Sequence, residues 1–177
     1  MDAVGYLQTP IGWIRFVLNE ARQLVRIDLN VPPPLNCENS VLFKDVCVQF
    51  SEYFEGARKN FTLPLCLNGR AFEMCVWKFL MEIPYGETRS YGEIAAVFGN
   101  QKAARAVGQA VHRNPLPIVV PCHRVVGASN LGGYIGGLTV KRFLLRLERA
   151  HKENGEVFMV KDFKKATATE QRVFATK

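Results

Sequence analysis

Hydrophobic positions near the start of the chain follow the pattern of β-strands. Residues 12–18 (GWIRFVL) are rich in β-forming side chains, and residues 24–29 (LVRIDL) alternate apolar with polar positions. The five residues NEARQ separate these segments, so together they predict a β-hairpin. Residues 60–67 favour a further strand, and Pro64 within them indicates an edge position because proline cannot donate to the hydrogen-bond ladder.

A helical pattern lies between these expected strands. Three consecutive prolines at 32–34 end any regular element, and beyond them apolar residues recur at every fourth position: Leu42, Val46, Phe50 and Phe54. Asn39 or Ser40 is the expected N-cap, and Gly56 is the expected stop signal. Residues 1–70 therefore predict a small α+β domain, in which no residues are arranged for an obvious chemistry.

From residue 71 onward the apolar positions follow helical spacing. One stripe predicts a first helix that ends at residues 84–86, with Phe72, Cys75, Val76, Phe79, Leu80 and Ile83 as its members. Ser90 and Glu93 form a capping box that predicts a short second helix, and a third helix is expected over residues 102–113. Two short helices joined by a glycine-containing turn indicate a helix-turn-helix, although many such corners bind nothing.

The last apolar segments surround a cysteine and a histidine. Residues 118–120 (IVV) predict a short buried extended segment that leads into PCHR at 121–124. A loop with five glycines follows at 127–137, and a final helix is expected over residues 139–150. The polar remainder, 151–177, is expected to be partly disordered.

Composition excludes several classes of protein. The chain of 177 residues is 48% hydrophobic, which is enough for a packed core and too much for a disordered protein. No apolar run reaches the about 18 residues that a membrane span needs. The first residues show neither the basic nor the apolar region of a secretory signal. Five cysteines without paired spacing fit a reducing compartment rather than a disulfide framework.

The net charge of +7 is concentrated in the second half of the chain. Residues 1–70 carry seven basic and seven acidic side chains, whereas residues 71–150 carry ten basic and five acidic ones. No acidic residue lies between Glu93 and Glu148. Such a field favours a polyanion, for example a nucleic acid, as the partner, and a solvated basic face is the alternative.

Cys122 and His123 are the strongest candidates for chemistry. A thiol reacts as a nucleophile in its thiolate form, so it needs a base or a positive field nearby. His123 can supply the base, and Glu148 is the nearest downstream acid that can orient the imidazole, as in hydrolytic triads. A buried structural cysteine beside a surface histidine is the alternative.

The sequence around this pair resembles the active-site signature of the O6-alkylguanine-DNA alkyltransferases, also called methylated-DNA-protein-cysteine methyltransferases. The resemblance is carried by residues 114–126 (NPLPIVVPCHRVV) and by shorter segments on both sides, at 83–88, 90–95, 103–108 and 133–137. It is dense over residues 71–150 and only general over residues 1–70. It implies an α+β fold, with a ribonuclease H-like supporting domain at 1–70 and a mostly helical, helix-turn-helix domain at 71–150.

The resemblance also implies a reaction and the residues that carry it. Cys122 would accept the alkyl group from O6 of a flipped guanine, irreversibly and once per molecule, without a cofactor. His123 would take the thiol proton through a water molecule, and Glu148 would fix the imidazole tautomer. Tyr91 would donate its hydroxyl to the guanine ring, and Asn114 would brace the turn that carries the cysteine.

Further residues are implied to hold the DNA and the flipped base. Arg105 would fill the gap that the base leaves, and the small residues of its helix, among them Ala104, Ala106 and Gly108, would let that helix approach the minor groove. Arg124 is a further expected DNA contact. The base pocket is expected to include Val125, Tyr134, Ile135 and Gly136. Ile135 stands where many relatives carry a small residue, so bulky adducts such as benzyl would fit poorly if it faces the pocket.

No metal is expected, because the N-terminal cysteines Cys37, Cys47 and Cys66 come before the first histidine, His112. The expected partner is double-stranded DNA that contains O6-alkylguanine, while O4-alkylthymine as a substrate and cooperative binding stay open. We expect a monomer without a membrane, in the cytoplasm of a prokaryote or the nucleus of a eukaryote. Two other functions compete with repair: a non-catalytic binder of alkylated bases, and a thiol hydrolase.

Overall fold

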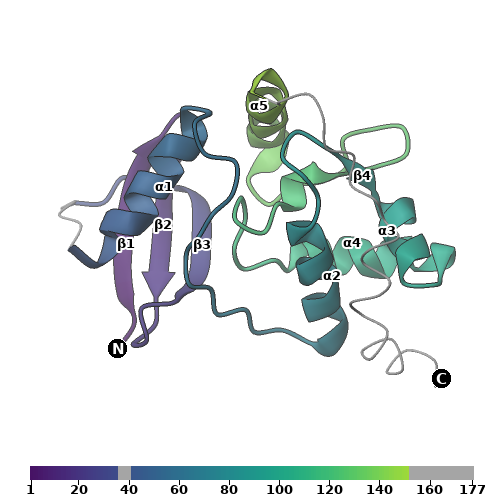
Figure 1. Ribbon diagram of the computed structural model, residues 1–177, viewed down its shortest axis with the longest axis horizontal. Helices are drawn as coiled ribbons and strands as arrows, with labels where there is room; N and C mark the ends of the chain where they lie inside the picture. The colour runs from purple at the N-terminus through teal and green to yellow at the C-terminus, as the bar shows by residue number, and fades with distance from the viewer. Residues whose placement is uncertain (36–40, 152–177) are drawn as a thin grey trace.

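The computed structural model describes residues 1–35 and 41–151, and it places a small sheet with one helix beside a group of helices (Figure 1). The expected N-cap residues Asn39 and Ser40 lie outside the described residues, as does the expected tail apart from His151. None of the helices in the described part of the chain is long and apolar enough to span a membrane. The chain is α+β, as expected.

The N-terminal sheet has three antiparallel strands in the order β1 (Ala3–Thr9), β2 (Gly12–Leu18) and β3 (Leu24–Val31). The hairpin of β2 and β3 is confirmed, whereas β1 was not expected from the sequence. Ile14, Phe16 and Leu18 alternate along β2 and are buried. This alternation gives the sheet one face that is covered by the rest of the protein.

Helix α1 (Lys44–Phe54), preceded by a short 3-10 turn at Val41–Phe43, packs on that sheet (Figure 1). The rings of Phe16 and Phe50 stand edge to face, with 4.8 Å between their centroids. The fourfold apolar pattern holds inside the helix but not before it, since Leu42 is 40% exposed. Gly56 ends the helix with a φ of 76°, a conformation that favours glycine.

The strand expected over residues 60–67 is wrong. The segment is irregular and makes only a single-residue parallel bridge between Leu24 and Leu65. The Pro64 carbonyl accepts from Leu24 N at 2.8 Å, and Cys66 N donates to the Leu24 carbonyl at 3.0 Å. Proline lacks the donor that a longer ladder needs, so residues 60–67 run as a connection towards the helices.

The second half holds α2 (Ala71–Met81), α3 (Tyr91–Val97), α4 (Ala104–His112) and α5 (Gly137–Ala150). The capping box is confirmed, because Glu93 N donates to Ser90 Oγ at 3.1 Å and Ser90 N donates to Glu93 Oε2 at 2.6 Å. A 3-10 turn at Gln101–Ala103 leads into α4. Trp77 Nε1 donates to the Ala110 carbonyl at 2.8 Å, which joins α2 to α4.

Residues 118–120 do not form the expected extended segment. Ile118 has a φ of 77°, an outlier for a β-branched side chain, so the chain turns sharply there. The turn leads into a 3-10 helix, η3 (Cys122–Arg124), and then into the two-residue strand β5 (Val125–Val126), which pairs in parallel with β4 (Arg89–Ser90).

The two halves share one buried core and are joined by hydrogen bonds. Ile27 N of β3 donates to the Pro115 carbonyl at 2.9 Å, and Asn30 Nδ2 donates to the Gly136 carbonyl at 2.9 Å. Helix α5 stands between the sheet and the helix-turn-helix of α3 and α4 (Figure 1). Its residues can therefore reach partners from both halves of the chain.

Candidate active site

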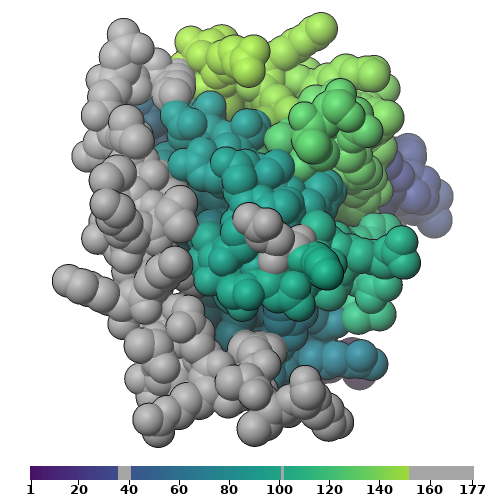
Figure 2. Space-filling model, turned by 90° about the vertical axis from the view of Figure 1, so that its right-hand side faces the viewer, coloured from purple at the N-terminus to yellow at the C-terminus, as the bar shows by residue number. Residues whose placement is uncertain are grey.

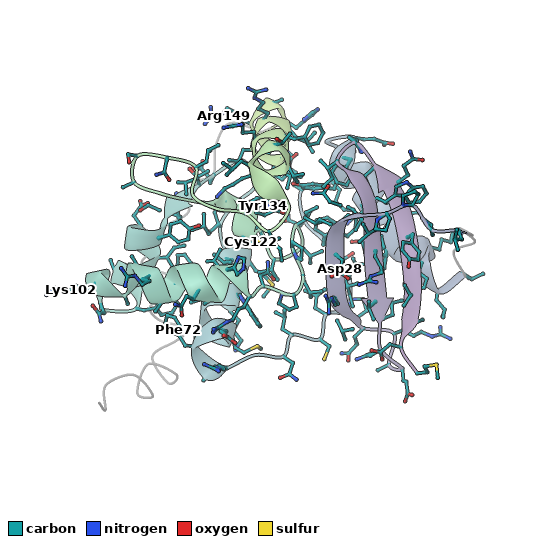
Figure 3. The ribbon with its side chains drawn as sticks, turned by 180° about the vertical axis from the view of Figure 1, so that it is seen from behind. Asp28, Phe72, Lys102, Cys122, Tyr134 and Arg149 are labelled. Atoms are coloured by element: carbon teal, nitrogen blue, oxygen red, sulfur yellow. The ribbon has the colours of Figure 1, made fainter. Side chains whose placement is uncertain are left out.

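Cys122 is the first residue of η3 and is 3% exposed. Figure 3 shows it beside Tyr134, between α4 and α5. The turn in front of it is held by Asn114, whose Nδ2 donates to the Val120 carbonyl at 2.8 Å and whose Oδ1 accepts from Leu116 N at 3.0 Å. Cys122 N donates to the same Val120 carbonyl at 2.8 Å. Asn114 thus fixes the backbone that presents the thiol.

His123 and Glu148 form a buried pair next to the thiol. His123 Nε2 lies 2.7 Å from Glu148 Oε1, and both side chains are fully buried. Burial lowers the pKa of His123, so the imidazole is neutral at neutral pH. Because a carboxylate can only accept, the proton of the ring lies on Nε2, which donates a hydrogen bond to Glu148. The other ring nitrogen, Nδ1, is then free to act as a base, and it has no hydrogen-bond partner among the described atoms.

Arg124 is placed inside the protein rather than on a DNA-facing surface. Its Nε donates to Glu148 Oε2 at 2.9 Å, its Nη2 donates to Glu148 Oε1 at 2.9 Å, and its Nη1 donates to the Ile83 carbonyl at 2.6 Å. Only 6% of the residue is exposed. The expectation that Arg124 contacts DNA is therefore corrected: a guanidinium committed to a buried carboxylate cannot reach a phosphate.

The thiol is not ionised in the unliganded protein. Burial raises the pKa of the Cys122 thiol to about 11, and the Asn114 side chain and the Lys141 charge oppose that rise only in part. A neutral thiol beside a neutral imidazole can transfer its proton when a substrate arrives.

A cavity of about 210 Å³ lies over the sulfur. Its lining consists of Tyr91, Gly108, Val111, His112, Cys122, Gly133, Tyr134 and Ile135. Two of the four expected pocket residues, Tyr134 and Ile135, are among them, together with Tyr91, the expected hydrogen-bond donor to the base. The carbonyl oxygens of the other two, Val125 and Gly136, are already bonded inside the protein, to Lys141 Nζ at 2.5 Å and to Asn30 Nδ2 at 2.9 Å.

The Tyr91 ring is fixed against glycines on two sides. A Cβ at Gly132, whose φ is 65°, would lie 2.9 Å from Tyr91 Cε2, and a Cβ at Gly108 would lie 3.8 Å from the same ring. Burial raises the pKa of Tyr91, so its phenol keeps its proton and can donate a hydrogen bond. The loop and α4 together therefore hold a hydrogen-bond donor at the wall of the cavity.

A groove of about 590 Å³ along α4 adjoins this cavity. It is lined by Tyr91, Ala104, Arg105, Gly108, Gln109, His112 and Arg113, so it shares three residues with the cavity. Arg105 and Ala106 are exposed. Figure 2 looks onto the right-hand side of Figure 1, where the teal segment that contains α3 and α4 occupies the centre of the face. The cavity thus lies beside a helix whose surface carries basic residues and small side chains.

Sequence reasoning missed two buried polar residues near the site. Lys141 of α5 is fully buried, and its Nζ donates to the carbonyls of Val125, Leu131 and Gly133. Burial lowers its pKa to about 8. Tyr53 of α1 reaches Glu148 from the N-terminal half. Each lies on the apolar stripe of its helix. A side chain that ends in a polar group at such a position predicts a buried hydrogen bond, and this pattern could have identified both residues.

Within residues 1–35 and 41–151, no group of three or more His, Cys, Asp or Glu side chains is placed to hold a metal ion. The four cysteines in this part of the chain, Cys47, Cys66, Cys75 and Cys122, are free thiols. The site itself brings together a thiol, an imidazole and a carboxylate. A buried thiol of this kind, beside a groove along a basic helix, is typical of a nucleic-acid-binding protein with a reactive cysteine.

Known proteins place the chain within that class. A family model described as "6-O-methylguanine DNA methyltransferase, ribonuclease-like domain" matches residues 3–67, and one described as "6-O-methylguanine DNA methyltransferase, DNA binding domain" matches residues 71–150. The chain belongs to the 6-O-methylguanine DNA methyltransferase family.

Individual relatives agree with that membership. A methylated-DNA–protein-cysteine methyltransferase of Methanosarcina barkeri is 43% identical over 150 residues, which cover 80% of this chain and 94% of the relative. The enzyme of that name from Bacillus subtilis, described as constitutive, is 56% identical over 108 residues, 59% of this chain and 66% of the relative. The crystal structure of Mycobacterium tuberculosis O6-methylguanine methyltransferase has 40% identity and a TM-score of 0.76, covering 88% of this chain and 97% of that one.

Proposed function

We propose that this protein repairs DNA by transferring the alkyl group of O6-alkylguanine to Sγ of Cys122, once per molecule. As a member of its family, it is a methylated-DNA–protein-cysteine methyltransferase. One observation carries the assignment to Cys122: its sulfur lies under a cavity that shares Tyr91, Gly108 and His112 with the groove along α4. The homologous M. tuberculosis protein, at 40% identity, has been solved in complex with DNA.

The transfer is a displacement at an sp3 carbon. Sγ of Cys122 forms the new bond to the alkyl carbon, the bond from that carbon to O6 breaks, and its electron pair leaves on O6 of guanine. The thiol proton passes through a water molecule to Nδ1 of His123, which is buried and without a partner among the described atoms. Glu148 stabilises the imidazolium that forms. A thioether has no leaving group suited to hydrolysis, so the reaction ends there.

Two further residues, Tyr91 and Asn114, support this step. Tyr91 keeps its phenol proton and lines the cavity, so it can donate a hydrogen bond to the departing guanine and stabilise the charge on it. Asn114 holds the turn through Val120 and so keeps the sulfur in line with the carbon. These roles need no cofactor and no metal ion.

DNA binding falls to α4 and the adjoining loop. Arg105 is exposed on α4, and Ala104, Ala106 and Gly108 give that helix a thin surface for the minor groove. A base inside a duplex cannot reach a buried sulfur, so the damaged guanine has to rotate out into the cavity while Arg105 fills the vacated space. O4-alkylthymine, with an alkylated oxygen at a comparable place, is a candidate second substrate.

The remaining parts of the proposal concern organisation. Residues 1–70 act as a supporting domain and residues 71–150 as the DNA-binding and alkyl-acceptor domain. The protein works as a monomer on double-stranded DNA, and it acts in the cytoplasm of a prokaryote or the nucleus of a eukaryote. The single-turnover chemistry asks for no second subunit, since every group named above belongs to one chain.

Duplex DNA with a radiolabelled methyl group on O6 of guanine tests the function directly. We expect label on the peptide that contains Cys122, rising to one methyl group per protein molecule and no further. Cys122→Ala should keep its DNA affinity and take no label, whereas Cys66→Ala should take label as the wild type does. Tight binding without transfer would instead indicate a lesion binder, and neither binding nor transfer would leave a thiol hydrolase.

A further inference from the structure

The Tyr53 hydroxyl reaches the catalytic pair from the other half of the protein. It belongs to α1, yet its oxygen lies 2.8 Å from Glu148 Oε1 and 3.5 Å from His123 Nε2. The side chain is fully buried. Burial, followed by the nearby Glu148 charge, raises the pKa of Tyr53 well above its usual value, so the phenol is a donor at every working pH.

Glu148 collects hydrogen bonds from four residues. His123, Arg124 and Gly86, whose backbone N donates to Oε2 at 3.0 Å, all lie in the second half of the chain. Tyr53 is the one donor among them that comes from residues 1–70. Because Tyr53 and His123 share Oε1, the strength of one of these hydrogen bonds affects the other.

Aromatic packing fixes the place of that hydroxyl. The Tyr53 ring contacts Phe54 and Phe61, each at 5.4 Å between centroids, and Tyr85 at 6.1 Å. Phe54 in turn lies 6.4 Å from Phe143 of α5, the helix that carries Glu148. The phenol therefore cannot turn away from the carboxylate without disturbing a packed cluster.

We propose that Tyr53 is a positioning residue for alkyl transfer, through which the N-terminal half holds Glu148 and tunes His123. The proposal rests on the roles given above to His123 and Glu148. The hydroxyl holds Oε1 opposite Nε2, and by donating to it withdraws part of the negative charge that would stabilise an imidazolium. His123 thus stays neutral, and able to accept the thiol proton, until the substrate is in place.

Tyr53→Phe removes the oxygen and keeps the ring, and Tyr85→Phe is its matched control. The Tyr85 hydroxyl is also buried and near this site, but it has no hydrogen-bond partner among the described atoms. We expect Tyr53→Phe to slow methyl transfer from duplex DNA about tenfold, because Oε1 is then no longer held opposite Nε2 and the His123 imidazole is less well oriented. DNA affinity should not change, and Tyr85→Phe should react at the wild-type rate.

A pH readout separates this role from packing. Without the hydroxyl, Oε1 carries more charge and stabilises the imidazolium, so the pKa of His123 should rise by about one unit in Tyr53→Phe. NMR titration of the imidazole measures that shift without DNA, and the acid limb of the rate profile should move the same way. A ring-fluorinated tyrosine at position 53, a stronger donor that preserves the fold, should shift both in the opposite direction.

Two results would overturn the proposal. One is a Tyr53→Phe protein that transfers methyl groups at the wild-type rate with an unchanged pH profile. The other is an equal loss in Tyr53→Phe and Tyr85→Phe without any change in the His123 titration. If the wild-type protein takes up no label at all, the proposed function fails instead, and the His123 titration still decides whether Tyr53 tunes the imidazole.

Discussion

Nε of Arg124 lies 2.9 Å from Oε2 of Glu148, and Nη2 of Arg124 lies 2.9 Å from Oε1 of the same carboxylate. This two-point ion pair is buried, with Arg124 6% exposed and Glu148 fully buried. Burial raises the pKa of Glu148, but His123 and the Arg124 guanidinium outweigh it and keep that pKa below its usual value. The ion pair thus allows a charged carboxylate to exist in the core beside the catalytic imidazole.

Removing the arginine should destabilise the protein strongly. Arg124→Met leaves the Glu148 charge buried without its main partner, which we expect to lower the free energy of unfolding by about 3–5 kcal/mol. Urea denaturation at neutral pH measures the loss. Arg142→Met, at an exposed position on the same helix as Glu148, is the control and should change the value by less than about 0.5 kcal/mol. Equal effects of both variants would contradict the structural role of the pair.

The thiol should make stability depend on pH in the alkaline range. The pKa of Cys122 is about 11 in the folded protein, above the about 8.5 of an unfolded cysteine, so its contribution is complete below pH 8.5 and is lost as the pH rises towards 11. By pH 10.5 the linkage relation gives a loss of about 2.5 kcal/mol in the wild type that Cys122→Ser does not share. Denaturation of both proteins across this range is the measurement, and parallel curves would refute the prediction.

Ile135 should limit the size of the alkyl group. It lines the cavity over Cys122 and is 52% exposed, so its side chain stands at the cavity mouth. Ile135→Ala should raise the transfer rate of a benzyl group relative to a methyl group about tenfold. This is the size of discrimination expected when a pocket gains room for one or more methylene groups. The control is Leu138→Ala, which truncates another exposed side chain of this region. The two rates are compared on otherwise identical duplexes, and an unchanged ratio in Ile135→Ala would show that this side chain does not set the limit.

Arg105 should matter only when the base has to leave a duplex. Arg105→Ala should slow transfer from an O6-methylguanine duplex about tenfold or more, because the flipped state loses the side chain that fills the gap. The reaction with a free O6-alkylguanine base should be unaffected, since nothing is flipped. Arg22→Ala, which removes an exposed arginine from the N-terminal half, should leave both reactions unchanged. A comparable loss on free base and duplex would assign Arg105 to the chemistry instead.

Much of the site was accessible from the sequence because its signals are local. The Ser90–Glu93 capping box spans four residues, and the β2–β3 hairpin spans twenty residues, so both follow from short-range pattern. PCHR at 121–124 carries the proposed nucleophile and the proposed base side by side. The expectations were wrong where contacts between residues far apart in the sequence decided the structure. Residues 60–67 have strand-like composition, but only one residue of β3 is available to pair with them.

The sequence by itself determined the class of fold and the candidate reacting groups, since a thiol, an imidazole and the helical periods are properties of single residues and short segments. Only the tertiary structure decided how those atoms behave. It turned Arg124 inward onto Glu148 and raised the pKa of the Cys122 thiol by burial. It also placed the Tyr53 hydroxyl against the same carboxylate, although the two residues are 95 positions apart in the sequence. Burial and long-range hydrogen bonds come into being when the two halves pack together, so no local pattern could contain them.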